Sequence, residues 1–221
     1  MMAGLSFTHR FEPGAKPDAL PLLLLHGTGG NEHDLISLGQ AIAPGAALLA
    51  PRGKVLEHGM PRFFRRLAEG VFDEDDVRRR AHELADFVEA ARKEYNIATP
   101  IALGYSNGAN IAAAMMPLRP EVLGGGILLR AMVPLASGVA PASLFGKGVL
   151  IVSGLHDPIA SPEHAARLKS LLEAAGAEVV RRNVPAGHEL TQADVALARE
   201  WLQARHFAMR LNEIQAASAS H

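Results

Sequence analysis

The chain of 221 residues contains no cysteine. This absence excludes disulfide bonds, thiolate metal sites and a cysteine nucleophile, and it fits a reducing compartment. Long apolar runs are also missing: residues 19–25 form the longest one near the N-terminus, far short of the roughly 20 residues that span a bilayer. Residues 1–14 lack the charged-then-apolar layout of a signal peptide. We therefore expect a soluble, cytoplasmic protein that does not bind membranes.

The chain also lacks an excess of either charge, since its formal net charge is −1 and the acidic and basic residues are interspersed. Nucleic acids and anionic membrane surfaces attract clustered positive charge, so neither is an expected partner. The expected partner is a small, largely uncharged molecule. The hydrophobic content of 48% is enough for one sizeable core. We predict a single domain over residues 1–221, of which about 210–221 form a disordered tail.

Short apolar runs alternate along the chain with longer amphipathic stretches. The apolar character of most runs is nearly continuous, which indicates strands that are buried on both faces. Strands that alternate with helices form βαβ units, so the predicted fold is α/β, with a mostly parallel central sheet flanked by helices. We expect an additional antiparallel edge strand at residues 5–11. The predicted core strands are residues 21–25, 46–50, 101–105, 126–129, 149–152 and 178–184.

Ser106 lies in the pentapeptide Gly104-Tyr105-Ser106-Asn107-Gly108, between an apolar run and a predicted helix. A G-x-S-x-G sequence at a strand-to-helix turn is typical of a nucleophile elbow, whose cramped backbone excludes side chains at the flanking positions. Such a turn leaves the serine hydroxyl exposed above the sheet, so Ser106 is the candidate nucleophile. The pattern also arises by chance, and the prediction therefore depends on an acid, a base and oxyanion donors in fitting places.

Asp157 and His188 occupy the places where such partners are expected. Asp157 follows the predicted strand 149–152, and His188 follows the last predicted strand. Since the carboxyl ends of parallel strands meet at one edge of a sheet, both side chains should approach Ser106. The order Ser, Asp, His is that of an α/β-hydrolase triad, with Asp157 as the acid and His188 as the general base. Taken singly, each has a simpler interpretation, as a turn aspartate and as one of ten histidines.

The glycine-rich segment 26–30 follows the first strong strand and should lie at the same edge of the sheet. Its backbone can turn an N–H toward a developing oxyanion. We expect the backbone N–H groups of Thr28 and Asn107 to be the two oxyanion donors. A phosphate-binding loop is the rival interpretation, but the segment has no lysine and no G-x-G-x-x-G sequence.

No metal and no organic cofactor is expected. A zinc site would have to draw on His26, His33, Asp34 or His58, but no pair among them has the spacing of zinc ligands. Residues 31–34 are better explained as the start of a helix. A serine nucleophile with a neighbouring base needs neither metal nor cofactor.

Residues 53–72 form a long connection of the kind that often covers a site. We expect this connection and the segment after strand 126–129 to line the substrate pocket. Ordinary core packing is the open alternative, and it is slightly favoured for the two phenylalanines. The candidate pocket residues are Met60, Phe63, Phe64, Met132 and Leu135.

Four segments carry the most specific sequence signals: residues 25–32 (LHGTGGNE), 103–110 (LGYSNGAN), 156–158 (HDP) and 187–190 (GHEL). In these segments the chain resembles the α/β-hydrolase superfamily, and within it the small phospholipase/carboxylesterase group, near the bacterial hydrolases related to hydroquinone resistance. The resemblance implies Ser106 as nucleophile, with Asp157 and His188 as its partners. It also implies hydrolysis of carboxylic esters of small or medium acyl size by a hydrolase core without a large cap domain.

Together these observations predict a serine carboxylesterase that acts through an acyl-enzyme on Ser106. An acyl-thioesterase or a lysophospholipase would use the same triad, because the oxyanion donors do not distinguish the leaving group. A non-catalytic ligand-binding protein on the same fold is the alternative from a different class. The protein is expected to be a monomer or a homodimer.

Overall fold

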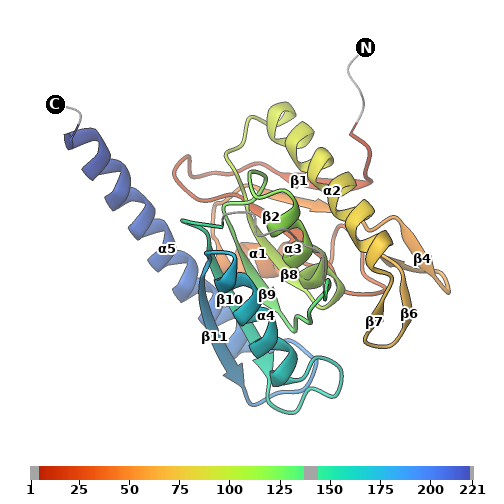
Figure 1. Ribbon diagram of the computed structural model, residues 1–221. Helices are drawn as coiled ribbons and strands as arrows, with labels where there is room; N and C mark the ends of the chain where they lie inside the picture. The colour runs from red at the N-terminus through yellow and green to blue at the C-terminus, as the bar shows by residue number, and fades with distance from the viewer. Residues whose placement is uncertain (1–4, 137–143, 220–221) are drawn as a thin grey trace.

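The computed structural model describes residues 5–136 and 144–219 and is built around a seven-stranded sheet (Figure 1). The strands are β1 (His9–Glu12), β2 (Leu22–Leu25), β3 (Leu48–Pro51), β8 (Ile101–Tyr105), β9 (Gly125–Leu129), β10 (Gly148–Gly154) and β11 (Glu178–Val184). Their order in the sheet is β1-β3-β2-β8-β9-β10-β11. β1 pairs antiparallel with β3, and the other neighbours pair in parallel. The predicted α/β fold with a mostly parallel sheet is confirmed.

The strands match the predicted apolar runs, with small shifts at their ends. β8 and β11 have the predicted bounds. β10 is longer than predicted because Gly148, Ser153 and Gly154 are also buried and pair with β11. The antiparallel edge strand is present but begins only at His9, because Phe7 before it packs into the core.

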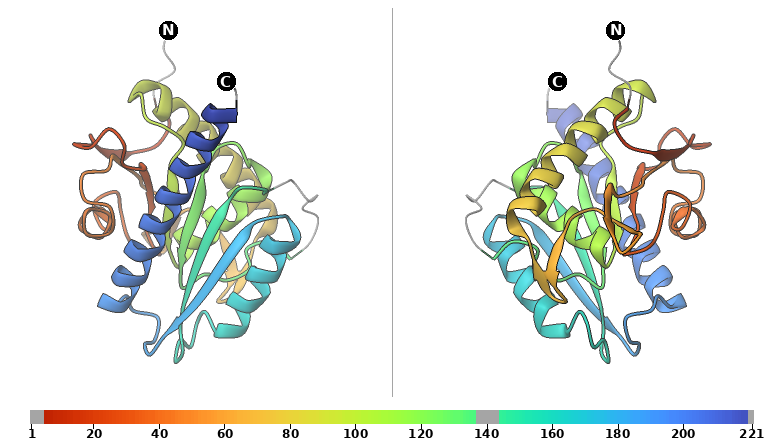
Figure 2. Two further views of the ribbon diagram at one scale, coloured as in Figure 1. Left: turned by 90° about the vertical axis from the view of Figure 1, so that its left-hand side faces the viewer. Right: turned by 90° about the vertical axis from the view of Figure 1, so that its right-hand side faces the viewer.

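Helices cover both faces of the sheet (Figure 2). They are α1 (Ile36–Ile42), α2 (Glu74–Glu94), α3 (Asn107–Leu118), α4 (Pro162–Ala174) and α5 (Gln192–Ala219). α2, α3 and α4 pack on one face, and α1 and α5 pack on the other. Leu23 and Leu25 of β2 belong to the first of these cores, whereas Leu22 and Leu24 belong to the second. Burial of both faces explains the continuous apolar character of the strands.

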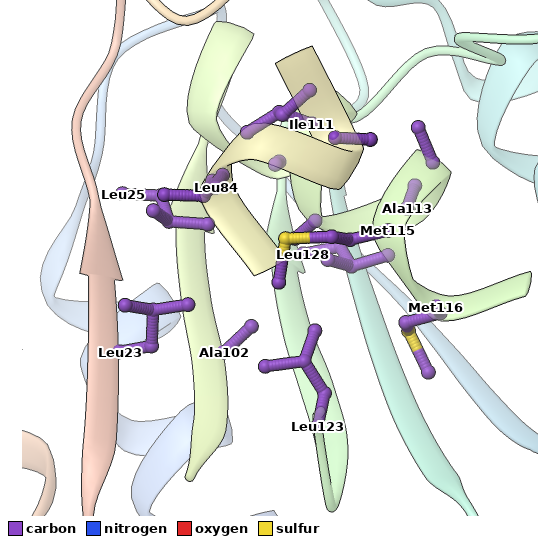
Figure 3. Close-up of a cluster of buried hydrophobic side chains, with 14 of the residues drawn as sticks. Leu23, Leu25, Leu84, Ala102, Ile111, Ala113, Met115, Met116, Leu123 and Leu128 are labelled. Carbon is purple, nitrogen blue, oxygen red and sulfur yellow. The ribbon is translucent and has the colours of Figure 1, made fainter. Parts of the chain in front are cut away.

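Figure 3 shows part of the core between the sheet, α2 and α3. Leu84 of α2, Met115 of α3 and Leu128 of β9 meet there, and each is at most 1% exposed. Burying a side chain of this size stabilises the fold by about 1.5–3 kcal/mol. Most residues of α3 are small or apolar and buried, so this helix lies close against the sheet. The N-terminus of α3, directly after Ser106, is therefore held by core packing.

Residues 53–72 form two small hairpins that the sequence did not predict. β4 (Val55–Glu57) pairs with β5 (Met60–Arg62), and β6 (Arg66–Ala68) pairs with β7 (Val71–Phe72), both antiparallel. His58 and Gly59 form the first turn with φ values of 51° and 82°, and positive φ at both central residues is typical of tight hairpin turns. These strands have only two or three residues, which is too short for a readable alternation of apolar and polar residues.

α5 extends to Ala219, and its C-terminal part projects beyond the body of the molecule (Figure 1). Residues 210–219, which were predicted to be a disordered tail, are therefore helical in the structure. Residues 210–219 contain three alanines together with leucine, glutamate and glutamine, all good helix formers, and their helix propensity outweighs their small and polar character. Residues 220 and 221 of the predicted tail lie outside the described residues. In the described ranges, no helix is long and apolar enough to cross a membrane.

Candidate active site

Ser106 lies at the sharp turn between β8 and α3, as predicted. Its backbone has φ 52° and ψ −113°, a conformation that costs a non-glycine residue about 1–3 kcal/mol. Hydrogen bonds on both sides hold it there: the Ser106 N–H donates to the carbonyl of Leu129 at 2.9 Å, and the Ser106 carbonyl accepts from the Asn110 N–H at 3.0 Å. The strained residue is thus fixed between β9 and the first turn of α3.

The two glycines that flank Ser106 are required by space. A Cβ at Gly108 would lie 1.9 Å from the carbonyl oxygen of Leu25, and a Cβ at Gly104 would lie 2.6 Å from the carbonyl oxygen of Gly108. Both distances are far below contact distance. The physical reason given for the G-x-S-x-G pattern therefore holds in this fold.

His188 lies between Ser106 and Asp157 and is hydrogen-bonded to both. Its Nε2 is 2.9 Å from Ser106 Oγ, and its Nδ1 is 2.9 Å from Asp157 Oδ2. The side chain of Asp157 is fully buried, and that of His188 is 21% exposed. The structure thus brings together the three side chains that the sequence singled out, each from a loop after a different parallel strand.

Asp157 also serves the simpler role that was considered for it. Its Oδ1 accepts from the N–H groups of Ile159 and Ala160 at 2.8 and 2.9 Å, while Oδ2 faces His188. The turn interpretation and the triad interpretation are therefore compatible, because each uses a different oxygen. The turn fixes the direction in which the carboxylate points.

Tyr105 supports the loop that carries His188. Its hydroxyl donates to the carbonyl of His188 at 3.0 Å. Burial raises the pKa of Tyr105, so the hydroxyl remains protonated and able to donate. The residue was part of the recognised pentapeptide, but its contact with the histidine loop depends on the register of strands that are distant in sequence.

Arg130, which the sequence reasoning missed, lies directly after β9 and reaches the same loop. Its guanidinium donates to the carbonyls of Gly187 and Glu189 at 3.0 and 2.7 Å, and to the carboxylate of Asp194 at 2.7 and 3.0 Å. The side chains of Arg130 and Asp194 are both fully buried. A signal was available in the sequence: Arg130 follows a buried strand at the edge where the other site residues lie.

The residues whose N–H groups are the two predicted oxyanion donors lie at the pocket that contains Ser106. Thr28 and Asn107 line the same pocket as Ser106. Among the described residues, no backbone carbonyl accepts from the Thr28 N–H. The Asn107 N–H belongs to the first turn of α3, where N–H groups have no acceptor within the helix. Both groups therefore remain free of backbone partners beside the reacting hydroxyl.

The hairpin segment, residues 53–72, fixes the glycine-rich segment 26–30 and the side chain of Asn107. The Gly29 N–H donates to the carbonyl of Pro61 at 2.9 Å, and Arg62 donates from Nη1 to Thr28 Oγ1 at 2.5 Å. Asn107 accepts through Oδ1 from the Phe63 N–H at 2.7 Å. The hydroxyl of Thr28 and the amide oxygen of Asn107 are thus engaged in structural contacts.

His26 holds the backbone rather than facing the pocket. Its Nδ1 lies 2.7 Å from the carbonyl of Gly27, and its Nε2 accepts from the Gly53 N–H at 3.0 Å. Burial lowers the pKa of His26 and so favours the neutral imidazole that this arrangement needs. His26 therefore ties the glycine-rich segment to the start of the hairpin segment.

A pocket of about 200 Å³ opens beside Ser106 and His188. One side of it is polar, because Arg62 and Arg66 share Glu57, with Nε–Oε distances of 3.2 and 2.8 Å. Burial lowers the pKa of Arg62 from its ordinary value. The remaining lining residues are Thr28, Glu69, Gly70, Phe72, Tyr105, Asn107, Asn110, Met132 and Ile159.

Met132 lines this pocket as predicted, but the other four candidates lie elsewhere. Phe63 and Phe64 are 3% and 0% exposed and belong to the hydrophobic core, as does Leu135. Met60 is 40% exposed at the hairpin turn and lies beside Gly29 of the glycine-rich segment 26–30. For the two phenylalanines the structure agrees with core packing, the slightly favoured alternative, because the segment after β5 turns both into the core while Arg62 lines the pocket instead.

The residues considered for zinc are not gathered into a site. His33 lies beside Arg10, with 3.1 Å between Nδ1 and Nη1, and both ring nitrogens of His26 are engaged as described. Within residues 5–136 and 144–219, no group of three or more potential ligands could hold a metal ion.

No protein-family model matches the chain. The Bacillus subtilis strain 168 protein named "Putative hydrolase MhqD" is 48% identical over 195 residues, which are 87% of this chain and 96% of that protein. A Bacillus cereus carboxylesterase of known structure is 46% identical, with a TM-score of 0.88 over 91% of this chain and 96% of that one. A Mesorhizobium loti carboxylesterase structure is 34% identical, with a TM-score of 0.85 and coverage of 90% and 96%. The likeness therefore extends over nearly the whole of each protein.

Proposed function

The chain belongs to the phospholipase/carboxylesterase group of the α/β-hydrolases, and from this premise we propose that it is a serine carboxylesterase acting through Ser106. Hydrolysis of an ester bond in a small molecule is the reaction class of the family. The nucleophile, the acyl-enzyme and the preference for short- to medium-chain acyl groups are the parts that we propose for this chain.

The observation that supports the nucleophile is the unbroken series of hydrogen bonds from Ser106 through His188 to Asp157, with both distances at 2.9 Å. A free serine hydroxyl is a poor nucleophile at neutral pH. His188 accepts the hydroxyl proton at Nε2 while Ser106 Oγ attacks the ester carbonyl carbon. Asp157 fixes the imidazole through Nδ1 and stabilises the imidazolium that forms.

The tetrahedral intermediate then collapses and the carbon–oxygen bond to the alcohol breaks, with the alcohol leaving as it takes the proton from His188. A water molecule next gives a proton to His188 while its oxygen attacks the carbonyl carbon of the acyl-serine. When this second tetrahedral intermediate collapses, the bond from the carbonyl carbon to Ser106 Oγ breaks, Oγ takes the proton back from His188, and the acid is released. The N–H groups of Thr28 and Asn107 stabilise the oxyanion in both steps. Loss of one such donor costs about 3–4 kcal/mol of barrier in comparable sites.

The size of the pocket supports small acyl groups. Its volume of about 200 Å³ lies below the roughly 300–1,000 Å³ of pockets that enclose drug-sized ligands. Met132, Phe72 and Ile159 provide an apolar part of the wall for a short chain. The volume counts against a lysophospholipid, because a long acyl chain would extend beyond the pocket into solvent.

Steady-state hydrolysis of p-nitrophenyl esters tests the proposal. The wild-type protein should turn over the acetate and butyrate esters faster than the octanoate and palmitate esters. Ser106→Ala should lose several decades of kcat and keep its melting temperature. Unchanged turnover in Ser106→Ala would contradict the assignment of the nucleophile, and preference for acyl-CoA over all p-nitrophenyl esters would establish the thioesterase alternative.

A folded wild-type protein that hydrolyses none of these esters or thioesters would favour the binding-protein alternative.

We also propose a cytoplasmic location, which a chain without cysteine fits. The proposal of a monomer or homodimer is tested by sedimentation equilibrium.

A further inference from the structure

We propose that Arg130 is a positioning residue that sets the histidine loop, residues 187–189, so that His188 can take the proton of Ser106. This inference rests on the proposed function, since it assigns Arg130 a part in the same reaction. Arg130 touches neither Ser106 Oγ nor the His188 ring. It acts on the backbone that carries the ring.

Arg130 binds the residues on both sides of His188, the proposed base. Nε donates to the carbonyl of Gly187 at 3.0 Å and Nη2 donates to the carbonyl of Glu189 at 2.7 Å, so the residues on both sides of His188 are bound to one rigid plane. Tyr105 holds the third carbonyl of the loop, that of His188 itself, at 3.0 Å. Every carbonyl of residues 187–189 is therefore fixed by a side chain from outside the loop, either Tyr105 at the end of β8 or Arg130 directly after β9.

A buried carboxylate orients the guanidinium. Asp194 accepts from Nη1 and Nη2 of Arg130 at 2.7 and 3.0 Å. Asp194 also accepts from the N–H and the hydroxyl of Thr191 at 2.8 and 2.9 Å. The carboxylate is thereby fixed at the start of α5, and the arginine has no freedom to turn. Bidentate pairing of this kind adds geometric specificity to the interaction energy.

The backbone of Arg130 connects this support to the nucleophile. Arg130 has φ 56°, a left-handed conformation that a non-glycine residue adopts only with strain. Its N–H donates to Val152 of β10, while the carbonyl of the preceding Leu129 accepts from the Ser106 N–H, both at 2.9 Å. Leu129 and Arg130, at the end of β9, therefore act together. The Leu129 carbonyl fixes Ser106, and the Arg130 side chain fixes the histidine loop.

Loss of this arrangement should lower kcat and leave substrate binding nearly unchanged. The loop carbonyls need donors at fixed positions, and the distance between His188 Nε2 and Ser106 Oγ depends on them. A displacement of about 1 Å at a reacting group can reduce a rate by about 100-fold. Arg130 is not among the residues that line the pocket, so the binding of substrate should change little when it is replaced.

Two variants test the proposal. Arg130→Lys keeps a cation beside Asp194, but one ammonium cannot reproduce the planar fork that joins two carbonyls and a carboxylate. Arg130→Met combined with Asp194→Asn removes both charges together, which avoids leaving one buried charge unpaired. In both we expect kcat for p-nitrophenyl acetate to fall by about 10- to 100-fold, with KM within about threefold of the wild type. Labelling of Ser106 by a fluorophosphonate should slow in parallel.

The matched control is Arg119→Lys. Arg119 forms ion pairs with Asp86, Glu89 and Glu121 at the end of α3 opposite Ser106. This variant should keep the wild-type kcat, KM and labelling rate. The comparison separates the loss of an ion-paired arginine from the loss of support for the histidine loop.

Several outcomes would overturn the role of Arg130: a folded variant with kcat within twofold of the wild type, a rise in KM without a fall in kcat, or failure of both variants to fold. The last would assign the arginine to stability alone. A wild-type protein that neither hydrolyses esters nor reacts with the fluorophosphonate would instead contradict the proposed function, so the two failures are distinguishable.

Discussion

The backbone of Ser106 is held in a conformation that its own side chain disfavours. At φ 52° and ψ −113°, the Cβ is strained, and the hydrogen bonds to Leu129 and Asn110 maintain the turn against that strain. Local strain at a reacting residue is compatible with a stable fold because the surrounding core is closely packed. It gives the serine an exposed hydroxyl at the expense of stability.

Ser106→Gly should therefore be more stable than Ser106→Ala, by about 1 kcal/mol in the free energy of unfolding, because glycine adopts this conformation without strain. Urea denaturation of the two variants measures the difference, and neither should hydrolyse esters. Ala204→Gly, at an exposed position of α5, is the control and should lose roughly 0.5–1 kcal/mol. A Ser106→Gly protein that is less stable than Ser106→Ala would show that the turn carries no strain.

Residue identities at the site were predictable where a residue follows a predicted parallel strand. Ser106, Asp157 and His188 were found together because each follows such a strand and has a side chain with known chemistry. Arg130 follows such a strand as well, but an arginine alone does not indicate a partner. Its partners are backbone carbonyls, and no sequence pattern reveals those. Phe63 and Phe64 were candidates for the pocket, with core packing slightly favoured, and the structure places both in the core. Nothing in the sequence showed which way the segment between the two hairpins would turn them.

At the scale of elements, an ion pair joins the segment after β2 to the end of β3. Glu32 accepts two hydrogen bonds from Arg52 at 2.5 and 2.6 Å. The hydrogen bonds from Arg52 lower the pKa of Glu32 from 4.5 to about 2. Glu32 lies just after the glycine-rich segment 26–30 that carries Thr28, so the pair helps to fix the end of this segment.

The pair predicts a pH dependence of stability. Because the pKa of Glu32 is lower in the folded protein than in the unfolded chain, its contribution is present above pH 4.5 and is lost as the pH falls toward 2. Wild type should be more stable than Glu32→Gln at neutral pH, and the difference should shrink steadily between these two pH values. Urea denaturation of both proteins over a pH series measures it.

Glu173→Gln is the control for this series. Glu173 pairs with Lys169 on the exposed surface of α4, and such i,i+4 pairs contribute about 0.2–0.5 kcal/mol. The control should therefore stay close to the wild type at every pH. A difference between wild type and Glu32→Gln that remains constant down to the lowest pH would contradict the lowered pKa.

At the scale of the whole molecule, the sheet was predictable and its additions were not. Continuous apolar runs indicated the parallel strands correctly, because burial on both faces leaves a strong signal in the sequence. The hairpins of residues 53–72 escaped prediction because their short strands and turns are fixed by contacts with Thr28 and Asn107, which are distant in sequence. The helical end of α5 was not predicted, because the small and polar composition of this segment indicated disorder although the helix propensity of its residues favours a helix.

Fold and site meet at one edge of the sheet. The loops after β8, β10 and β11 carry Ser106, Asp157 and His188, the proposed nucleophile, acid and base, while Arg130 directly after β9 holds the loop of His188. The central claim is that this edge makes Ser106 reactive. Among the side chains described within residues 5–136 and 144–219, Ser106 is the one serine whose hydroxyl is hydrogen-bonded to a histidine.

The most direct test is mass spectrometry of the intact, folded protein after reaction with a fluorophosphonate, followed by peptide mapping. We expect a single adduct on Ser106, formed at a rate that falls by several decades in His188→Ala, and no adduct in Ser106→Ala. An adduct on a different serine, or a folded wild-type protein that remains unlabelled, would contradict the claim that this edge makes Ser106 reactive.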